Sequence, residues 1–234
     1  MIQHVWERAS KAVVLSEVAI ATPDDAIIRA VEAFGARAIK TLASHRSGTD
    51  RLAEAATLMG LNDKDVVVNV QGDEPLLDPK SIDAVVNLLQ SDRDLQMASA
   101  MCVCSREDLD SPDCVKVVCA RNGDALYFSR ARLPFPRQAE GATVYQHVGL
   151  YAYRRHFLGM LGSLPATPLE MTESLEQLRV LEHGYKIRMA PVSEAAFGVD
   201  TPEDLERVRA LIHDGPQHDG GTGTNAASTR WQRT

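Results

Sequence analysis

Apolar positions along the chain recur with two periods, one typical of helices and one typical of strands. Helical spacing predicts helices over residues 2–10, 26–34, 49–59, 172–182 and 202–212. Alternating or continuous apolar runs predict strands over residues 17–21, 38–41, 66–70, 96–103, 115–120 and 144–153. In the first half the two kinds of element alternate, which predicts an α/β fold with a mainly parallel sheet and helices on both faces.

Local signals fix several boundaries of these elements. Asp24 or Asp25 can cap the second helix, and Gly35 and Gly60 follow the ends of the second and third helices. The strand at 66–70 is almost entirely valine, as in strands that are buried on both faces. After Asp214 the composition turns to glycine, proline and polar residues that cannot form a core. The sequence therefore predicts one domain over residues 1–213 and a disordered tail over 214–234.

Charge and composition exclude some classes of protein. The 234 residues carry 25 Lys and Arg against 32 Asp and Glu, a net charge of −7, which argues against nucleic acid as the main partner. No apolar run is long enough to span a membrane, and the N-terminus resembles an amphipathic helix rather than a signal peptide, so we expect a cytoplasmic protein. The four cysteines lack the spacing of a zinc site and are expected to be reduced, structural thiols, here Cys102, Cys104, Cys114 and Cys119.

Two carboxylates occupy positions suited to a metal. Asp73 follows the buried strand 66–70 within Gln71-Gly72-Asp73-Glu74-Pro75, and ligands of open α/β sheets bind beyond the carboxyl ends of strands. Gly72 would allow a ligand to approach the backbone, although an ordinary acidic turn also explains this segment. Asp200 precedes a second motif in which Thr201 and Asp204 resemble a helix-capping box. Together Asp73 and Asp200 would supply the oxygen ligands that Mg²⁺ prefers.

Three further segments carry candidate binding groups. The loop at 45–51 opens a helix, where Ser47 or Thr49 can act as a cap or the loop can read a base edge. His147 and Tyr151 alternate on one face of the strand 144–153. Glu173, Glu176, Gln177 and Val180 are expected on one face of the helix 172–182. The last two groups could form a wall of polar side chains that binds a polyol, or could be purely structural.

Six segments resemble motifs of the 3-deoxy-manno-octulosonate (Kdo) cytidylyltransferase family and occur in the same order as in that family. The resemblance covers about residues 1–212. The first three run from His45 to Glu54, from Val68 to Pro75 and from Ala125 to Arg130. The others run from His147 to Tyr153, from Leu175 to Leu181 and from Gly198 to Leu205, and these favour Kdo enzymes over sialic acid enzymes.

The resemblance implies a Rossmann-like nucleotidyltransferase that transfers CMP from CTP to Kdo, giving CMP-Kdo and pyrophosphate for lipopolysaccharide biosynthesis. It implies that Asp73 and Asp200 hold Mg²⁺ and are the catalytic residues. It further implies nucleotide contacts from Ser47, Gly48, Gln71 and Gly72. The sugar pocket would comprise Gln71, Arg130, His147, Tyr151, Glu176 and Gln177. The family also implies a homodimer.

Two features depart from the family pattern. Family members open with a strand and a loop rich in Arg, Ser and Lys, whereas the chain opens in the helix that follows this region. The first strand is therefore expected to be missing, and Pro23 stands where the family usually has Asp. The alternatives are a cytidylyltransferase for another acidic sugar, such as 8-amino-Kdo or a sialic acid, or a truncated non-catalytic paralogue.

Overall fold

The computed structural model describes residues 1–45, 47–138, 143–195 and 197–214. The chain divides into two compact units, Met1–Gly198 and Val199–Thr234, which are described separately. Apart from Asp214, the predicted tail lies outside the described residues. Among the described helices, none is both long enough and apolar enough to cross a membrane.

The first part of unit Met1–Gly198 follows the predicted order. Its elements are α1 (Ile2–Ala9), β1 (Ala19–Thr22), α2 (Asp25–Ala33), β2 (Arg37–Lys40), α3 (Gly48–Leu58) and β3 (Val66–Asn69). Asp24 is the N-cap of α2, since its carboxylate accepts hydrogen bonds from the backbone N–H groups of Ala26 and Ile27. Gly35 and Gly60 follow helix ends with φ of 81° and 70°, a conformation that favours glycine. These boundaries confirm the expected helix signals.

The rest of this unit contains the predicted strands β4, β5 and β7 together with elements that the sequence pattern did not predict. In order these are α4 (Pro79–Ser91), β4 (Met97–Val103), β5 (Lys116–Cys119), β6 (Ala125–Ser129), β7 (Tyr145–Arg154), α5 (Arg155–Leu161), α6 (Pro168–Glu173), α7 (Glu176–Glu182) and β8 (Ile187–Pro191). The prediction of one helix over 172–182 is wrong. Ser174 adopts φ of 52°, which ends α6 and separates it from α7.

The long strand β7 organises the six-stranded sheet. One edge of β7 pairs with β4 along most of its length. The other edge pairs with β5 near Tyr145 and with β3 from Tyr151 to Arg154, so two strands share that edge end to end. All three pairings are antiparallel, whereas β4 pairs with β8 in parallel. Strands β3, β4, β5 and β8 therefore run in one direction, and β7 and β6 run against them.

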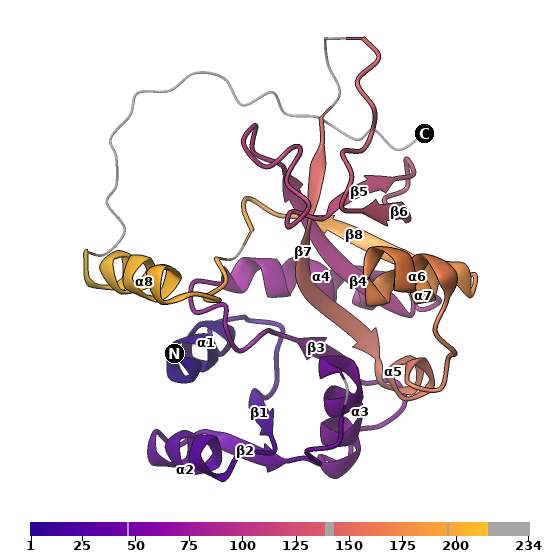
Figure 1. Cartoon of the computed structure of the whole chain (residues 1–234). Helices are drawn as coiled ribbons and strands as arrows, with labels where there is room; N and C mark the ends of the chain where they lie inside the picture. The colour runs from indigo at the N-terminus through magenta and orange to yellow at the C-terminus, as the bar shows by residue number, and fades with distance from the viewer. Residues whose placement is uncertain (46, 139–142, 196, 215–234) are drawn as a thin grey trace. The chain divides into compact units, whose positions relative to one another are not determined.

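The α/β class is thus confirmed. The sheet, expected to be mainly parallel, is mixed: β4 and β8 pair in parallel, whereas the pairings of β7 with β3, β4 and β5 and of β5 with β6 are antiparallel. Strands β1 and β2 form a separate parallel pair. In Figure 1, β7 runs through the middle of the larger unit, with the β5–β6 hairpin near its start and α5 after its end.

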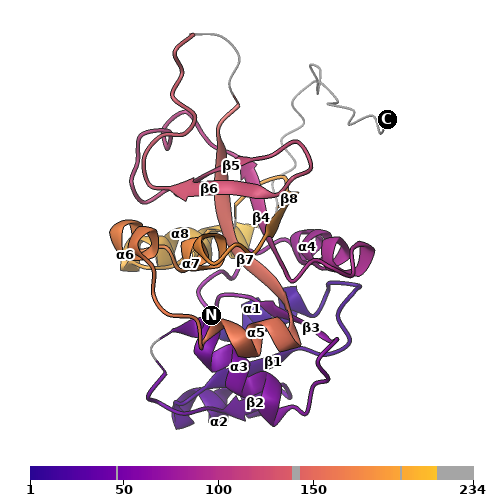
Figure 2. The same cartoon turned by 90° about the vertical axis from the view of Figure 1, so that its right-hand side faces the viewer.

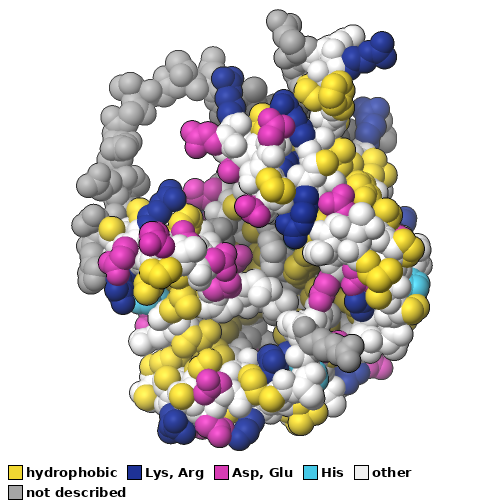
Figure 3. Space-filling view, viewed as in Figure 1, with side chains coloured by type: hydrophobic (Ala, Val, Ile, Leu, Met, Phe, Trp, Pro, Cys, Tyr) yellow, Lys and Arg dark blue, Asp and Glu magenta, His cyan; other side chains and the backbone are white. Residues whose placement is uncertain are grey.

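Helices cover both faces of the sheet, as the sequence pattern predicted. Side chains of α4, among them Ile82, Val85 and Leu89, pack with Val148 and Leu150 of β7 in one core. The opposite face packs against α5 and α7. Figure 2 shows α4 on one side of the sheet and α6 and α7 on the other. On the surface seen in Figure 3, acidic and basic side chains are interspersed.

Candidate active site

The loop before α3 lies next to the end of β3. Ser47 is the N-cap of α3, and its hydroxyl oxygen accepts a hydrogen bond from the backbone N–H of Asp50 at 3.2 Å. A side chain at Gly48 would lie 4.0 Å from Nδ2 of Asn69, the last residue of β3. The expected capping role of Ser47 is therefore confirmed. Arg46, in the same motif, lies outside the described residues.

The acidic turn after β3 presents a free carboxylate. Asp73 is half-buried, and within the described part of the chain its carboxylate accepts no hydrogen bond, so its oxygens can serve as metal ligands. A side chain at Gly72 would meet Cδ1 of Ile2 at 3.4 Å, so α1 approaches this turn. One carboxylate oxygen of Glu74 is buried and has no partner in the described structure. Burial, aided by the neighbouring charge of Asp73, raises the pKa of Glu74 to about 7.

One face of β7 carries a row of rings. The ring centroids of His147 and Tyr151 are 5.2 Å apart, and those of Tyr151 and Tyr153 are 6.0 Å apart. Phe128 of β6 meets His147 edge to face at 5.2 Å. The side chains at 148, 150 and 152 point into the core against α4. The strand alternation predicted for His147 and Tyr151 is therefore confirmed.

His147 is held as a neutral imidazole. Burial lowers its pKa to about 4, from an ordinary value of 6.5. Its Nε2 lies 2.9 Å from the hydroxyl oxygen of Ser99 on β4. A neutral ring at physiological pH can accept a hydrogen bond from a ligand hydroxyl, as a polyol site requires.

The low pKa of His147 predicts a loss of stability in mild acid. The folded protein binds the His147 proton only near pH 4, whereas the unfolded chain binds it near pH 6.5. The contribution of His147 is therefore fully present above pH 6.5 and is lost as the pH falls towards 4. We expect the free energy of unfolding, measured in urea, to fall more between pH 7 and 5 for the wild type than for His147→Gln. Equal losses in the two proteins would contradict the assignment.

Helices α6 and α7 form a hairpin that carries two predicted sugar ligands. Arg179 on α7 forms an ion pair with Glu170 on α6, and the Glu182 carboxylate accepts the backbone N–H groups of Leu169 and Glu170. Glu173 belongs to α6, so the expectation that it shares one helix face with Glu176, Gln177 and Val180 is wrong.

The α6–α7 hairpin meets the N-terminus of α3 at a small cavity. The Thr49 hydroxyl donates a hydrogen bond to the Glu176 carboxylate at 3.1 Å. Gln177 is only 5% exposed, and its amide makes no hydrogen bond within the described residues, so it can bind a ligand. A cavity of about 40 Å³ is lined by residues that include Ser47, Thr49, Tyr151, Tyr153, Glu176 and Gln177. Segments far apart in the sequence thus converge here.

His147 also faces a larger hollow. This hollow, of about 420 Å³, is lined by residues that include Ser111, Cys114, Gln146, His147 and Gly149. The Sγ atoms of Cys114 and Cys104 are 3.7 Å apart, and all four cysteines are free thiols, as predicted. Burial raises the pKa of Cys114 to about 12, so this thiol is protonated and unreactive at neutral pH.

Arg130 is positioned by main-chain acceptors. Its Nε donates to the carbonyl oxygen of Glu173 at 2.8 Å, and its Nη1 donates to that of Pro112 at 2.9 Å. The Glu173 carboxylate in turn accepts the Ser129 hydroxyl at 2.6 Å and the Arg130 backbone N–H at 3.0 Å. Burial opposes ionisation of Glu173, but these hydrogen bonds outweigh it and lower the pKa of the carboxyl.

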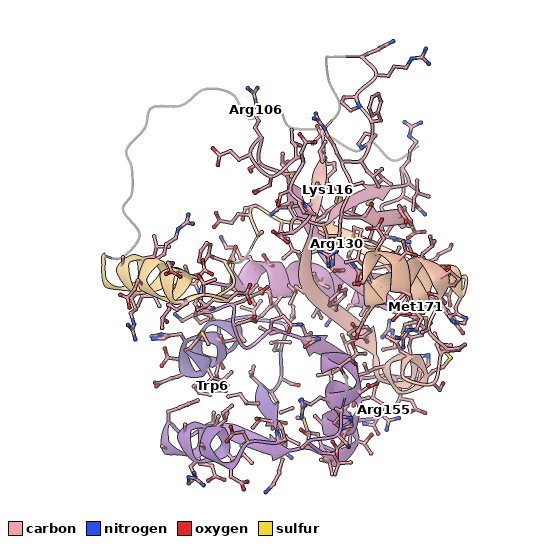
Figure 4. The ribbon with its side chains drawn as sticks, viewed as in Figure 1. Trp6, Arg106, Lys116, Arg130, Arg155 and Met171 are labelled. Atoms are coloured by element: carbon pink, nitrogen blue, oxygen red, sulfur yellow. The ribbon has the colours of Figure 1, made fainter. Side chains whose placement is uncertain are left out.

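A buried lysine supports the same region. Lys116 on β5 is fully buried, and its ammonium donates to the carbonyl oxygens of Ser111, Cys114 and Arg130. Figure 4 shows Lys116 and Arg130 on neighbouring parts of the structure beside β7. The Lys116 ammonium thus links the backbone of Ser111 and Cys114, which line the larger hollow, to the backbone of Arg130.

Asp200 belongs to the second unit, Val199–Thr234. There Thr201 and Asp204 form the predicted cap of α8 (Pro202–Asp214): the Asp204 carboxylate accepts the Thr201 N–H at 3.0 Å, and the Thr201 hydroxyl oxygen accepts the Asp204 N–H at 3.1 Å. Asp200 is exposed, and in the described structure its carboxylate takes no part in this cap. The pairing of Asp200 with Asp73 stays a prediction.

Sequence reasoning missed the residues that hold the site together. Ser99, Lys116 and the structural role of Glu173 were not predicted. The sequence could have indicated Ser99 and Lys116, because each is a single polar residue within an otherwise apolar strand. Such a residue is buried only when its polar atoms have hydrogen-bond partners.

Comparison with known proteins places the chain in a family. The cytidylyltransferase family matches residues 1–187. A 3-deoxy-manno-octulosonate cytidylyltransferase of Syntrophus aciditrophicus is 48% identical over 91% of this chain and 86% of its own length. An 8-amino-3,8-dideoxy-manno-octulosonate cytidylyltransferase of Shewanella woodyi is also 48% identical, over 91% of this chain and 87% of its own length.

Similarity to solved structures leads to the same family. The structure of a CMP:2-keto-3-deoxy-manno-octonic acid synthetase complexed with CTP matches with a TM-score of 0.87 and 43% identity, covering 91% of this chain and 87% of that one. A 4-diphosphocytidyl-2C-methyl-D-erythritol synthase shares the fold, with a TM-score of 0.60 at 12% identity over 90% of this chain and 87% of that one. The chain therefore belongs to the cytidylyltransferase family of nucleotidyltransferases and groups within it with the 3-deoxy-manno-octulosonate cytidylyltransferases.

Proposed function

We infer that the protein transfers CMP from CTP to Kdo, releasing CMP-Kdo and pyrophosphate. The observation that carries this inference is the convergence of Ser47 from the α3 loop, Tyr151 from β7 and Gln177 from α7 on one cavity. A helix N-terminus beside a wall of amide, hydroxyl and carboxylate groups suits a nucleotide next to a polyol. Relatives at 48% identity act, by their names, on Kdo or on its 8-amino analogue.

The reaction needs positioning and charge neutralisation more than a covalent nucleophile. The anomeric oxygen of the sugar forms a bond to the α-phosphorus of CTP, and the bond from that phosphorus to the oxygen that bridges to the β-phosphate breaks. Pyrophosphate leaves with that oxygen, and the proton of the sugar hydroxyl passes to water. We propose that Asp73 and Asp200 hold Mg²⁺, which would neutralise phosphate charge when bound. The free carboxylate of Asp73, in the turn after β3, supports its part in this proposal.

Within the site we propose two groups of contacts. Ser47, Gly48, Gln71 and Gly72 would contact the nucleotide, because they lie at the α3 N-terminus and in the turn after β3. Gln71, Arg130, His147, Tyr151, Glu176 and Gln177 would contact the sugar. The ring contact between His147 and Tyr151 supports a shared sugar wall, since it joins the small cavity to the larger hollow.

The overall reaction is tested by pyrophosphate release from CTP with Kdo, with 8-amino-Kdo and with a sialic acid. We expect turnover with Kdo, and the equal identity to an 8-amino-Kdo enzyme makes that analogue the second candidate substrate. Turnover with the sialic acid alone would contradict the proposal. We also propose a cytoplasmic homodimer, to be checked by cell fractionation and by light scattering.

Gln177→Ala should lower the affinity for the sugar without lowering the affinity for the nucleotide. The buried Gln177 amide lacks a partner among the described residues, so a bound polyol would satisfy it. We expect the substitution to weaken Kdo affinity about tenfold and to change CTP affinity less than twofold, on the order of one lost hydrogen bond. Titration calorimetry with each ligand measures both values. An equal loss for the two ligands would indicate a purely structural role.

A further inference from the structure

Ser99 lies at an irregularity in the sheet, opposite His147. In the β4–β7 ladder Ser99 pairs with Tyr151, whereas the next residue, Ala100, pairs with Val148. Gly149 and Leu150 therefore have no partner in β4, and β7 bulges at this point. The Ser99 side chain is fully buried inside the bulge.

The Ser99 hydroxyl has three neighbours but only one proton. Its oxygen lies 2.9 Å from the carbonyl oxygen of Leu150, 3.3 Å from that of Val148 and 2.9 Å from Nε2 of His147. Two of the three neighbours are carbonyl oxygens, which can only accept hydrogen bonds, so we assign the single proton to one of them. The contact with His147 is then satisfied only if Nε2 carries a proton and donates to the serine oxygen.

This proton arrangement determines which ring nitrogen of His147 can accept a hydrogen bond. The ring is neutral at pH 7, because burial lowers the pKa of His147 to about 4. A neutral imidazole with a proton on Nε2 has a lone pair on Nδ1. Nδ1 has no hydrogen-bond partner in the part of the chain that the structure describes, and His147 lines the larger hollow with Gln146 and Gly149.

We propose that Ser99 is a positioning residue that fixes His147 in the Nε2–H tautomer, so that Nδ1 accepts a hydrogen bond from a hydroxyl of the sugar. The second half of this proposal rests on the proposed function; the first half does not. The bulge serves this arrangement, because it brings two carbonyl groups to the serine and leaves its oxygen free to accept from the ring.

The tautomer is tested directly by long-range ¹H–¹⁵N NMR of the free protein with labelled histidine. The His147 signals are identified by their loss in His147→Gln. In the wild type we expect Nε2 protonated and Nδ1 unprotonated, and in Ser99→Ala a mixture of the two tautomers. Ser99→Thr keeps the hydroxyl and should retain the wild-type pattern. Ser81→Ala, at another buried serine, is the matched control and should change nothing.

Kinetics tests the link to the sugar. For Ser99→Ala we expect the KM for Kdo to rise about fivefold to tenfold, with recovery in Ser99→Thr and with the KM for CTP within twofold of the wild type. A proton on Nδ1 in the wild type would overturn the proposed tautomer. A changed tautomer with an unchanged KM for Kdo would overturn the role in sugar binding. Absence of turnover with every sugar would overturn the proposed function and leave the NMR result to stand alone.

Discussion

Asp73→Asn is expected to reduce turnover at least about a hundredfold, which corresponds to about 3 kcal/mol of transition-state stabilisation. Asparagine keeps the shape of the side chain but removes the charge that would hold Mg²⁺ against the phosphates of CTP. The turn from Gln71 to Glu74 should keep its conformation, because its hydrogen bond joins backbone atoms and does not involve the Asp73 side chain. The loss should therefore appear in kcat rather than in stability. Asp200→Asn is expected to show a comparable loss.

The measurement is steady-state pyrophosphate release at saturating Mg²⁺, CTP and Kdo, together with a thermal melt of each variant. Asp94→Asn removes one carboxylate from an exposed position and is the matched control, with near-normal turnover expected. A near-normal rate for Asp73→Asn would end the assignment of Asp73 as a metal ligand. A rate loss accompanied by a large fall in melting temperature would point to a structural role instead.

Lys116→Met should lower the free energy of unfolding by about 3 kcal/mol, the largest stability effect that we expect from one substitution. The buried ammonium donates to three carbonyl groups, and methionine of similar length would leave all three without that donor. Each unpaired buried carbonyl costs about 1–3 kcal/mol, and removing the buried charge offsets part of that sum. Because one of the carbonyls belongs to Arg130, sugar binding should weaken as well.

Urea unfolding at pH 7 measures the stability change, with Lys64→Met at an exposed lysine as the control. If Lys116→Met and the control lower the free energy of unfolding by amounts that agree within about 0.5 kcal/mol, water must replace the ammonium without cost. Loss of stability with an unchanged KM for Kdo would contradict the coupling to Arg130.

The six strands that the sequence predicted are those with β-branched or alternating runs, such as Val66–Asn69. Helix α4 was not predicted although its signals are present, since Asp78 caps it, Pro79 opens it, and Ile82, Val85, Val86 and Leu89 follow a helical period. Strand β8, Ile187–Pro191, is short and carries a charged residue and a proline, so its apolar pattern is weak. The break at Ser174 could not be predicted, because a positive φ outside glycine is rare and depends on tertiary contacts.

Candidate site residues were found where a motif combined polar groups with a strand end or a helix start, as at Ser47 and Asp73. Residues that act through hydrogen bonds to another chain segment were not found. Ser99 contacts His147, and Lys116 contacts Arg130, through the sheet rather than along the sequence. A single sequence contains no information on such pairings, because strand register is set by long-range packing and by bulges.

The central place of β7 also dictates when this sheet can assemble. Strands β3, β4 and β5 all precede β7 in the chain, and each of them pairs with it. During synthesis these earlier strands must wait, with open edges, until Tyr145–Arg154 has left the ribosome, since contacts of long sequence separation form late. Unpaired strand edges promote association between chains, so the interval before Tyr145–Arg154 emerges is the stage of synthesis at which this sheet is most exposed to aggregation.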